Sequence, residues 1–248
     1  SPKSHVNTLA KEACPRVRKF RFTDNESIMI NQSQKPGEFR DDNVVGLLLA
    51  GGQSRRMGGG DKCLMNFGDG TLLDHVVRRL EPQVETCILN ANGDPERFSE
   101  FDLPVVADSI EGFAGPLAGI LSGMIWTRKN RPEIRWIVSI ATDTPFFPDD
   151  LVHHFLESAP AYPAICLAAT AGRLHPVFGL WPTALAEDLD SALRTGIRKV
   201  LDWTDKHTTE AVEFPLFNQS GIEIDPFFNT NRREDLAKAN EFQQKLAL

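Results

Sequence analysis

The sequence predicts an α/β fold in which a mostly parallel, twisted sheet is covered by helices on both sides. Continuous apolar runs alternate along the chain with segments whose apolar residues recur at helical spacing. The first run, at 44–50, is typical of a strand buried on both faces of a parallel sheet. Strands that alternate with helices in this way are joined by right-handed crossovers. With 248 residues the chain is long enough to bury a full core.

The first half of the predicted fold contains four strands and two helices. Thr71 is placed to cap the first helix, and Pro82 follows its end. The second helix opens at Gly115-Pro116, because proline is favoured in the first turn of a helix. The apolar stripes of the two helices are Leu72, Leu73, Val76, Val77 and Leu80, and Leu117, Ile120, Leu121, Met124 and Ile125. The strands that follow the first lie at 86–89, 104–107 and 136–141.

The second half of the chain is less regular. Strands at 164–168 and 177–181 flank a polar turn, and we expect them to add an antiparallel piece to the same sheet. Two helices are predicted at 182–193 and 198–203, followed by a short strand at 227–229. The apolar positions of a final, C-terminal helix are Leu236, Ala239 and Phe242.

The N-terminal 43 residues differ from the rest of the chain. They mix basic and acidic side chains with prolines and show no sustained period of either kind. We therefore predict a partly ordered extension or linker at 1–43 and a single domain at 44–248.

Composition excludes several classes of function. The formal net charge of -7 and the pI near 5.4 argue against a nucleic-acid-binding surface. No apolar run approaches the roughly 20 residues of a membrane span, and the N-terminus lacks the apolar core of a secretory signal. The scattered cysteines are Cys14, Cys63, Cys87 and Cys166, without a C-x-x-C pair. We expect reduced thiols in a cytoplasmic protein that binds neither nucleic acid nor membrane.

A glycine-rich basic loop follows the first strand. Residues 51–62 hold five glycines, two arginines and a lysine. Glycine lets backbone N–H groups approach an anion closely, and cations neutralise it, so this loop predicts a phosphate site. A Walker loop is excluded because Asp61 separates Gly60 from Lys62 and Cys63 follows the lysine. The dinucleotide fingerprint is excluded because residues 53–57 split the glycines.

The same stretch resembles the loop of nucleotidyltransferases. Its pattern is Leu49-Ala-Gly-Gly-x-x-x-Arg56-Met57-Gly-Gly-x-Asp61-Lys62, which is most similar to the molybdenum cofactor guanylyltransferases, the MobA family. Sugar-phosphate nucleotidyltransferases have a related loop with a different pattern between the arginine and the lysine. The resemblance reaches from Val44 to the C-terminal helix. It implies the nucleotidyltransferase fold, a Rossmann-like three-layer α/β/α arrangement with a mostly parallel mixed sheet.

Polar residues follow the predicted strands at Gly51, Asn90, Asp108 and Asp143. Because consecutive strand ends line one crevice of an open α/β sheet, we expect these residues to converge. Asn90 and Asp108 can hydrogen-bond a base or ribose edge, or alternatively cap their strand ends. Asp143, in a Thr-Asp-Thr-Pro segment that matches the family, is assigned to Mg²⁺. Its alternative role is that of a turn residue before Pro145.

The resemblance implies a role for each matching residue. Its nucleotide contacts are Leu49, Ala50, Gly51, Gly52, Lys62, Asn90, Asp108 and Asp143. Lys62 would stabilise charge on the phosphates, and Arg56 would grip the leaving pyrophosphate. Its acceptor side contains Gly115, Gly119, His175, Asn229 and Asn231. The family usually follows the two asparagines with Thr-Pro, whereas this chain has Arg232-Arg233.

The implied reaction joins GMP from GTP to the terminal phosphate of Mo-molybdopterin and releases pyrophosphate, with Mg²⁺ as cofactor. The expected partners are GTP, Mo-molybdopterin and the molybdoenzymes or chaperones that receive the product, and we expect a monomer. Molybdopterin cytidylyltransferases share the architecture, but their loop resembles Leu-Ala-Ala-Gly, so Gly51-Gly52 favours guanine. Two further hypotheses stay open, a sugar-phosphate nucleotidyltransferase and, from a different class, a nucleotide-binding module without catalysis.

Overall fold

A computed structural model gives the fold of the chain. It describes residues 41–50, 61–110, 112, 115–219 and 221–246. Gly51, Gly52 and Arg56, to which the sequence assigns roles, lie outside the described residues, and so do residues 1–40 of the predicted extension. The boundary at residue 44 stays a prediction, although the first strand already begins at Asp41.

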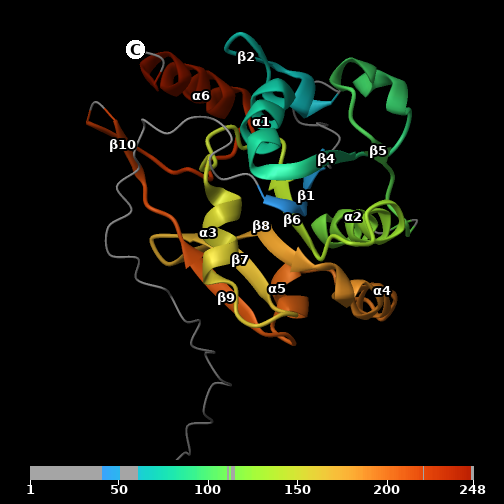
Figure 1. Cartoon of the computed structure of the whole chain (residues 1–248). Helices are drawn as coiled ribbons and strands as arrows, with labels where there is room; N and C mark the ends of the chain where they lie inside the picture. The colour runs from blue at the N-terminus through green and yellow to red at the C-terminus, as the bar shows by residue number, and fades with distance from the viewer. Residues whose placement is uncertain (1–40, 51–60, 111, 113–114, 220, 247–248) are drawn as a thin grey trace, which may run out of the picture.

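A seven-stranded sheet runs through the centre of the domain (Figure 1). Its strands, in spatial order, are β5 (Val105–Val106), β4 (Val84–Asn90), β1 (Asp41–Leu49), β6 (Trp136–Ala141), β8 (Arg173–Pro182), β7 (Ile165–Thr170) and β9 (Thr209–Glu213). Only β8 runs antiparallel to its neighbours among these seven. The predicted mostly parallel mixed sheet, with an antiparallel piece contributed by the second half, is therefore confirmed.

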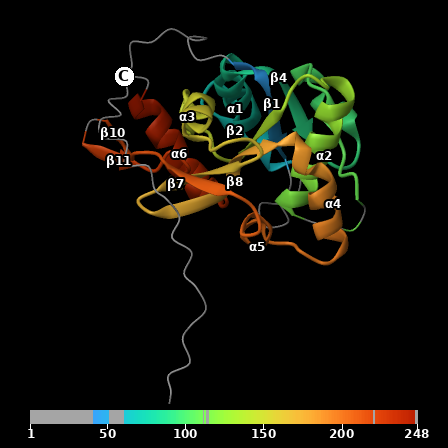
Figure 2. The same cartoon turned by 60° about the horizontal axis from the view of Figure 1, so that its bottom comes forward.

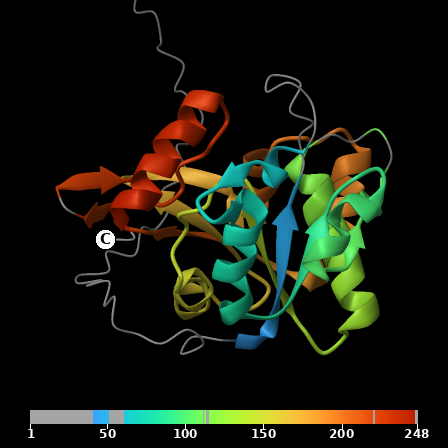
Figure 3. The ribbon, with the colours of Figure 1, turned by 90° about the horizontal axis from the view of Figure 1, so that it is seen from above.

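Helices cover both faces of the sheet. One face packs against α1 (Leu72–Leu80) and α3 (Leu151–Ser158), and the other against α2 (Pro116–Asn130), α4 (Ala186–Arg194) and α5 (Val200–Thr204). Figure 3 shows the blue strand β1 between the teal helix α1 and the green helix α2, and Figure 2 shows α2 beside α4.

Successive side chains of β1 point to opposite faces of the sheet and contribute to both layers of the core. Val44 and Leu48 belong to the cluster under α1 and α3, whereas Val45, Leu47 and Leu49 belong to the cluster under α2 and α4. All five side chains are buried. A strand that is apolar on both faces is what a sheet with helices on both sides requires.

The predicted elements are largely present, with two errors. Ile125, predicted on the apolar stripe of α2, is 43% exposed rather than buried. The short strand expected at 227–229 is wrong: these residues form a turn and irregular structure after the hairpin of β10 (Phe217–Gln219) and β11 (Ile222–Ile224). Phe227 is 4% exposed and packs on Phe178 and Phe214, so its apolar character serves the core rather than a strand. The sequence reasoning also missed α3, β9 and this hairpin.

The remaining elements are short turns and the last helix. The 3-10 turns are η1 (Lys62–Leu64), η2 (Glu81–Gln83), η3 (Pro95–Phe101) and η4 (Thr183–Leu185). A small hairpin, β2 (Asn66–Phe67) and β3 (Gly70–Thr71), precedes α1, and α6 (Arg233–Leu246) ends the fold. No helix within the described parts of the chain is both long and apolar enough to cross a membrane.

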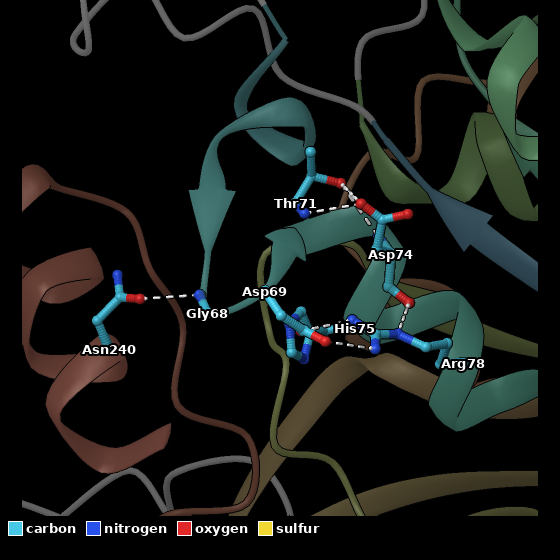
Figure 4. Close-up of polar contacts among 7 residues, drawn as sticks. All are labelled: Gly68, Asp69, Thr71, Asp74, His75, Arg78 and Asn240. Carbon is cyan, nitrogen blue, oxygen red and sulfur yellow. Dashed lines mark hydrogen bonds and ion pairs between the residues drawn. The ribbon is translucent and has the colours of Figure 1, made fainter. Parts of the chain in front are cut away.

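The hairpin β2–β3 attaches α6 to the body of the domain (Figure 4). The backbone N–H of Gly68, at the tip, donates to Oδ1 of Asn240 at 3.0 Å. Beneath it an apolar cluster joins the hairpin to α6 through Phe67, Leu72, Phe146, Ile224, Ala239 and Phe242. This contact fixes the position of α6, and with it the segment that immediately precedes that helix.

Thr71 caps α1 as the sequence predicted (Figure 4). Its Oγ1 accepts the backbone N–H of Asp74 at 3.2 Å, and Oδ2 of Asp74 accepts the backbone N–H of Thr71 at 2.7 Å. This reciprocal capping box satisfies two backbone donors that the first helical turn leaves unpaired.

We expect Thr71→Ala to lower the free energy of unfolding by about 1 kcal/mol, because the side-chain acceptor for the Asp74 N–H is lost. Urea denaturation measures the change. Thr71→Ser keeps the hydroxyl and should retain most of the stability; equal losses in the two variants would contradict the capping role.

Candidate active site

The carboxyl ends of three central strands lie side by side. The backbone N–H of Ala50 donates to the carbonyl oxygen of Asn90 at 3.0 Å, and that of Thr142 donates to the carbonyl oxygen of Leu49 at 3.3 Å. These bonds extend the β1–β4 and β1–β6 pairings beyond the last strand residues. The ends of β1, β4 and β6 therefore lie at one edge of the sheet, which agrees with the prediction for Asn90 and Asp143, whereas Gly51 lies outside the described residues.

The ammonium group of Lys62 contacts three side-chain oxygen atoms at this edge of the sheet. Nζ of Lys62 donates to Oδ2 of Asp143 at 2.6 Å, to Oδ1 of Asn231 at 2.9 Å and to Oδ1 of Asn229 at 3.4 Å. The side chains of Lys62 and Asp143 are only 14% and 21% exposed. Their attraction is therefore screened less than that of a surface ion pair. Lys62, predicted on the nucleotide side, thus contacts both Asp143 from that side and the two asparagines predicted on the acceptor side.

Thr230 holds the two asparagines at Asp143. It is fully buried, and both its backbone N–H and its Oγ1 donate to the carbonyl oxygen of Asp143, at 2.9 and 3.0 Å. Thr144 donates its hydroxyl to Oδ1 of Asp143 at 3.3 Å, so the second carboxylate oxygen also has a partner. Sequence reasoning did not single out Thr230, because a lone threonine between two asparagines carries no periodic or charge signal.

A second polar cluster lies at the ends of β4 and β5. Nδ2 of Asn90 donates to Oδ1 of Asp108 at 3.0 Å, and Nδ2 of Asn92 donates to Oδ2 of Asp108 at 2.8 Å. Oδ1 of Asn92 also accepts the backbone N–H of Asp108 at 2.8 Å. Two amides thus orient one carboxylate, which retains lone pairs for a ligand. Asn92 was missed, although its place two residues after Asn90 is a usable signal.

Gly119 explains why α2 can pass so close to this cluster. A Cβ at Gly119 would lie 2.4 Å from Oδ1 of Asn90 and 2.6 Å from Cδ2 of Leu49. The glycine therefore secures the position of Asn90, and its assignment to the acceptor stays a prediction. Gly115, at the start of α2, has φ +145°, a value that favours glycine.

His175 packs into an aromatic group. Its ring lies 4.5 Å from that of Phe227, which in turn packs on Phe178. Its described contacts are with this group rather than with Lys62 or Asp143, and its Nε2 is buried without a partner among the described atoms. Burial lowers the pKa of His175 below its ordinary value. Its acceptor role stays a prediction, and the structure shows a packing role.

The oxygen set around Lys62 fits a hard divalent cation. Within the described residues no three His, Cys, Asp or Glu side chains gather as a protein-only metal site. Asp143, Asn229 and Asn231 nevertheless place three oxygens within 3.4 Å of one positive charge. Mg²⁺ is commonly held by one or two carboxylates together with substrate phosphates and water. The neighbouring Cys63 is a poor nucleophile, because burial raises the pKa of its thiol to about 12.

Comparison with known families shows which family the chain belongs to. The MobA-like NTP transferase domain matches residues 46–210, which is most of the described core. The chain belongs to the MobA-like NTP transferase family. The predicted family membership is therefore confirmed, and the loop, Lys62, Asn90, Asp108 and Asp143 all lie within the matched segment.

Relatives of this MobA-like protein align with it over nearly their whole length. A molybdenum cofactor guanylyltransferase from Mesorhizobium japonicum is 48% identical over 205 residues, covering 82% of this chain and 97% of that protein. One from Bradyrhizobium sp. is 50% identical over 198 residues, covering 79% and 91%.

Solved structures share the fold. The molybdopterin-guanine dinucleotide biosynthesis protein A from Archaeoglobus fulgidus superposes with a TM-score of 0.61 at 21% identity, covering 81% of this chain and 99% of that one. A nucleotidyl transferase from Methanothermobacter gives a TM-score of 0.61 at 18% identity, covering 83% and 100%. The predicted nucleotidyltransferase fold is confirmed.

We expect Gly119→Ala to weaken nucleoside triphosphate binding by about tenfold or more, because the added Cβ must displace the Asn90 amide. Isothermal titration calorimetry measures the affinity. Gly123→Ala is the matched control, since its Cβ would crowd Leu47 one turn along the same helix and leave Asn90 in place. Equal affinities in the two variants would contradict the role of Gly119.

The buried His175 predicts a pH dependence of stability. Because its pKa is lowered in the folded state, the unfolded chain binds the proton first, and this side chain costs stability as pH falls below about 6.5. We expect His175→Phe to reduce the decline of the free energy of unfolding between pH 7 and pH 5, measured in urea.

His154 supplies the control with the opposite sign. A hydrogen bond with Asp150 raises the pKa of His154, so its contribution is present at low pH and is lost as pH rises through that pKa. His154→Gln should therefore steepen the same decline. A His175→Phe variant with the wild-type slope would contradict the assignment.

Proposed function

We propose that this protein is a molybdenum cofactor guanylyltransferase that transfers GMP from GTP to the terminal phosphate of Mo-molybdopterin and releases pyrophosphate. The observation that carries the proposal is the pairing of Lys62 with Asp143 and two asparagines, beside the Asn90–Asp108 cluster, in a MobA-like chain. The names of relatives that are 48% and 50% identical support the same reaction.

The Asn90–Asp108 cluster and the Lys62–Asp143 cluster would bind different parts of the nucleotide. The Asp108 carboxylate, oriented by two amides, offers acceptors to the N–H and O–H donors of guanine or ribose. Lys62 offers a positive charge on a flexible stem to the triphosphate. The carbonyl oxygen of Asn90 already pairs with Ala50, which fixes the backbone between the two clusters.

We propose Mg²⁺ as the metal and Asp143, with Asn229 and Asn231, as the side chains that would hold it. Bound there, Mg²⁺ would screen the negative charge of the phosphates. The ammonium group of Lys62 contacts the side-chain oxygens of these three residues. A triphosphate that binds beside them would offer this ammonium group phosphate oxygens as additional partners.

The acceptor is a phosphate, which is already an anion and needs no strong general base. One of its oxygens attacks the α-phosphorus of GTP, the bond from the α-phosphorus to the bridging oxygen breaks, and the electron pair leaves with pyrophosphate. Lys62 stabilises the charge that develops on the phosphate oxygens, and the strand ends hold the reactants in line. Arg56, outside the described residues, stays the predicted clamp for pyrophosphate.

The proposal includes the expected surroundings of the enzyme. We propose action as a monomer in the cytoplasm, with transfer of the product to molybdoenzymes or their chaperones. Among the described residues Cys63, Cys87 and Cys166 are buried free thiols, which supports a reduced environment.

The decisive experiment is incubation with molybdopterin, one nucleoside triphosphate at a time and Mg²⁺, with pyrophosphate release as the readout. The proposal expects release with GTP and little with CTP. Preference for CTP would make the protein a cytidylyltransferase. Release with a hexose phosphate in place of molybdopterin would make it a sugar-phosphate enzyme, and GTP binding without release would make it a non-catalytic module.

We expect Asp143→Asn to reduce metal-dependent turnover by about 100-fold or more, because several kcal/mol of metal-dependent charge stabilisation is lost. The fold should survive, since Thr230 is bonded to the backbone carbonyl of Asp143. The matched control is Asp190→Asn, which removes a carboxylate paired with Arg194 on α4. Full turnover of Asp143→Asn at ordinary Mg²⁺ concentration would contradict the metal assignment.

A further inference from the structure

We propose that Arg97 is a positioning residue that holds the Lys62 segment and the Asn92–Asp108 pair in one fixed register. Arg97 lies in η3, between β4 and β5. The inference rests on the proposed function, because it assigns Arg97 to the binding of the nucleoside triphosphate that the two clusters share.

The guanidinium group of Arg97 bridges two segments that are distant in sequence. Its Nε lies 2.6 Å from Oδ2 of Asp61, the residue immediately before Lys62. Its Nη2 donates to the carbonyl oxygen of Asn92 at 2.6 Å, and its Nη1 donates to the carbonyl oxygen of Asp94 at 2.9 Å. Arg97 therefore makes two hydrogen bonds to backbone carbonyls and an ion pair with Asp61. This combination uses the planar fork of arginine, which the single ammonium group of lysine does not reproduce.

The turn after β4 is shaped around this side chain. Gly93 has φ +91°, and a Cβ there would lie 2.9 Å from Nη1 of Arg97. The guanidinium carbon also lies 4.7 Å from the centre of the Phe98 ring, which is 1% exposed. A glycine that makes room on one side and a buried ring on the other indicate a built position rather than a solvated surface arginine.

Each segment that Arg97 touches continues into one of the two clusters. Asp61 precedes Lys62 and η1, so its carboxylate sets where the lysine stem begins. The Asn92 carbonyl belongs to the residue whose amide grips both the carboxylate and the backbone N–H of Asp108. One guanidinium therefore ties the origin of the phosphate-binding lysine to the residue that orients the base-side carboxylate.

This arrangement affects binding and not only stability. A nucleoside triphosphate that contacts both clusters needs their separation to be correct, so a shift of one cluster relative to the other weakens the binding of the nucleotide. Asp61 carries a charge next to Lys62, so loss of Arg97 also leaves a carboxylate uncompensated beside the phosphate site.

The test compares Arg97→Met and Arg97→Lys with the wild-type chain. We expect Arg97→Met to raise the KM for GTP by about tenfold or more and to change kcat less, because substrate placement is disturbed while Lys62 and Asp143 remain. Arg97→Lys keeps the charge without the fork and should recover part of the affinity. Direct GTP binding by calorimetry provides a readout independent of turnover.

A second variant and a matched control keep the test decisive. Gly93→Ala disturbs the same guanidinium without removing it and should raise KM in the same direction. Arg78→Met removes an arginine that forks onto Asp69, at 2.9 and 3.1 Å, on the β2–β3 hairpin side of α1 (Figure 4), and should leave KM unchanged.

Three outcomes are distinguished. A lowered melting temperature with wild-type KM and GTP affinity in the Arg97 and Gly93 variants would overturn the positioning role and leave the proposed function intact. A raised KM in Arg97→Met and Gly93→Ala, but not in Arg78→Met, supports it. Absence of nucleotide binding by the wild-type chain would overturn the proposed function and this inference together.

Discussion

The ion pair between Lys62 and Asp143 is the constraint on which the site depends. It joins the last residue of the glycine-rich loop to a residue just beyond the end of β6, 81 positions later in the sequence, at 2.6 Å. Two partly buried charges of opposite sign stabilise each other only when both are held in place. The buried β1 core, the β6 strand end and the η1 turn supply that placement. The apolar sheet thus positions Lys62 and Asp143, although neither residue lies within a strand.

The C-terminal part of the chain completes this site through packing. The hairpin β2–β3 and α6 share an apolar cluster and the Gly68–Asn240 hydrogen bond. The segment before α6 is then anchored at Asp143 by two hydrogen bonds from Thr230. The packing of α6, which lies away from the site, therefore helps to place the side-chain oxygens of Asn229 and Asn231 at Lys62. The family match ends at residue 210, before this segment.

Prediction from the sequence succeeded where one physical signal dominates. Apolar runs predict buried strands, Thr71 predicts a helix start, and polar strand ends predict convergence. Phe227 was misread because the same apolar pattern serves a turn packed on Phe178. Arg97 and Thr230 escaped notice because their roles are hydrogen bonds to backbone carbonyls that become neighbours only in the folded chain. Such contacts leave no periodicity to read.

The central claim is that Lys62 and Asp143 act as one unit, and a double-mutant cycle on turnover tests it most directly. Pyrophosphate release would be measured for Lys62→Met, Asp143→Asn and the double variant. Residues that act as a unit are strongly non-additive, so the double variant should lose no more than about threefold beyond the worse single variant. A loss equal to the product of the two single losses would contradict the account.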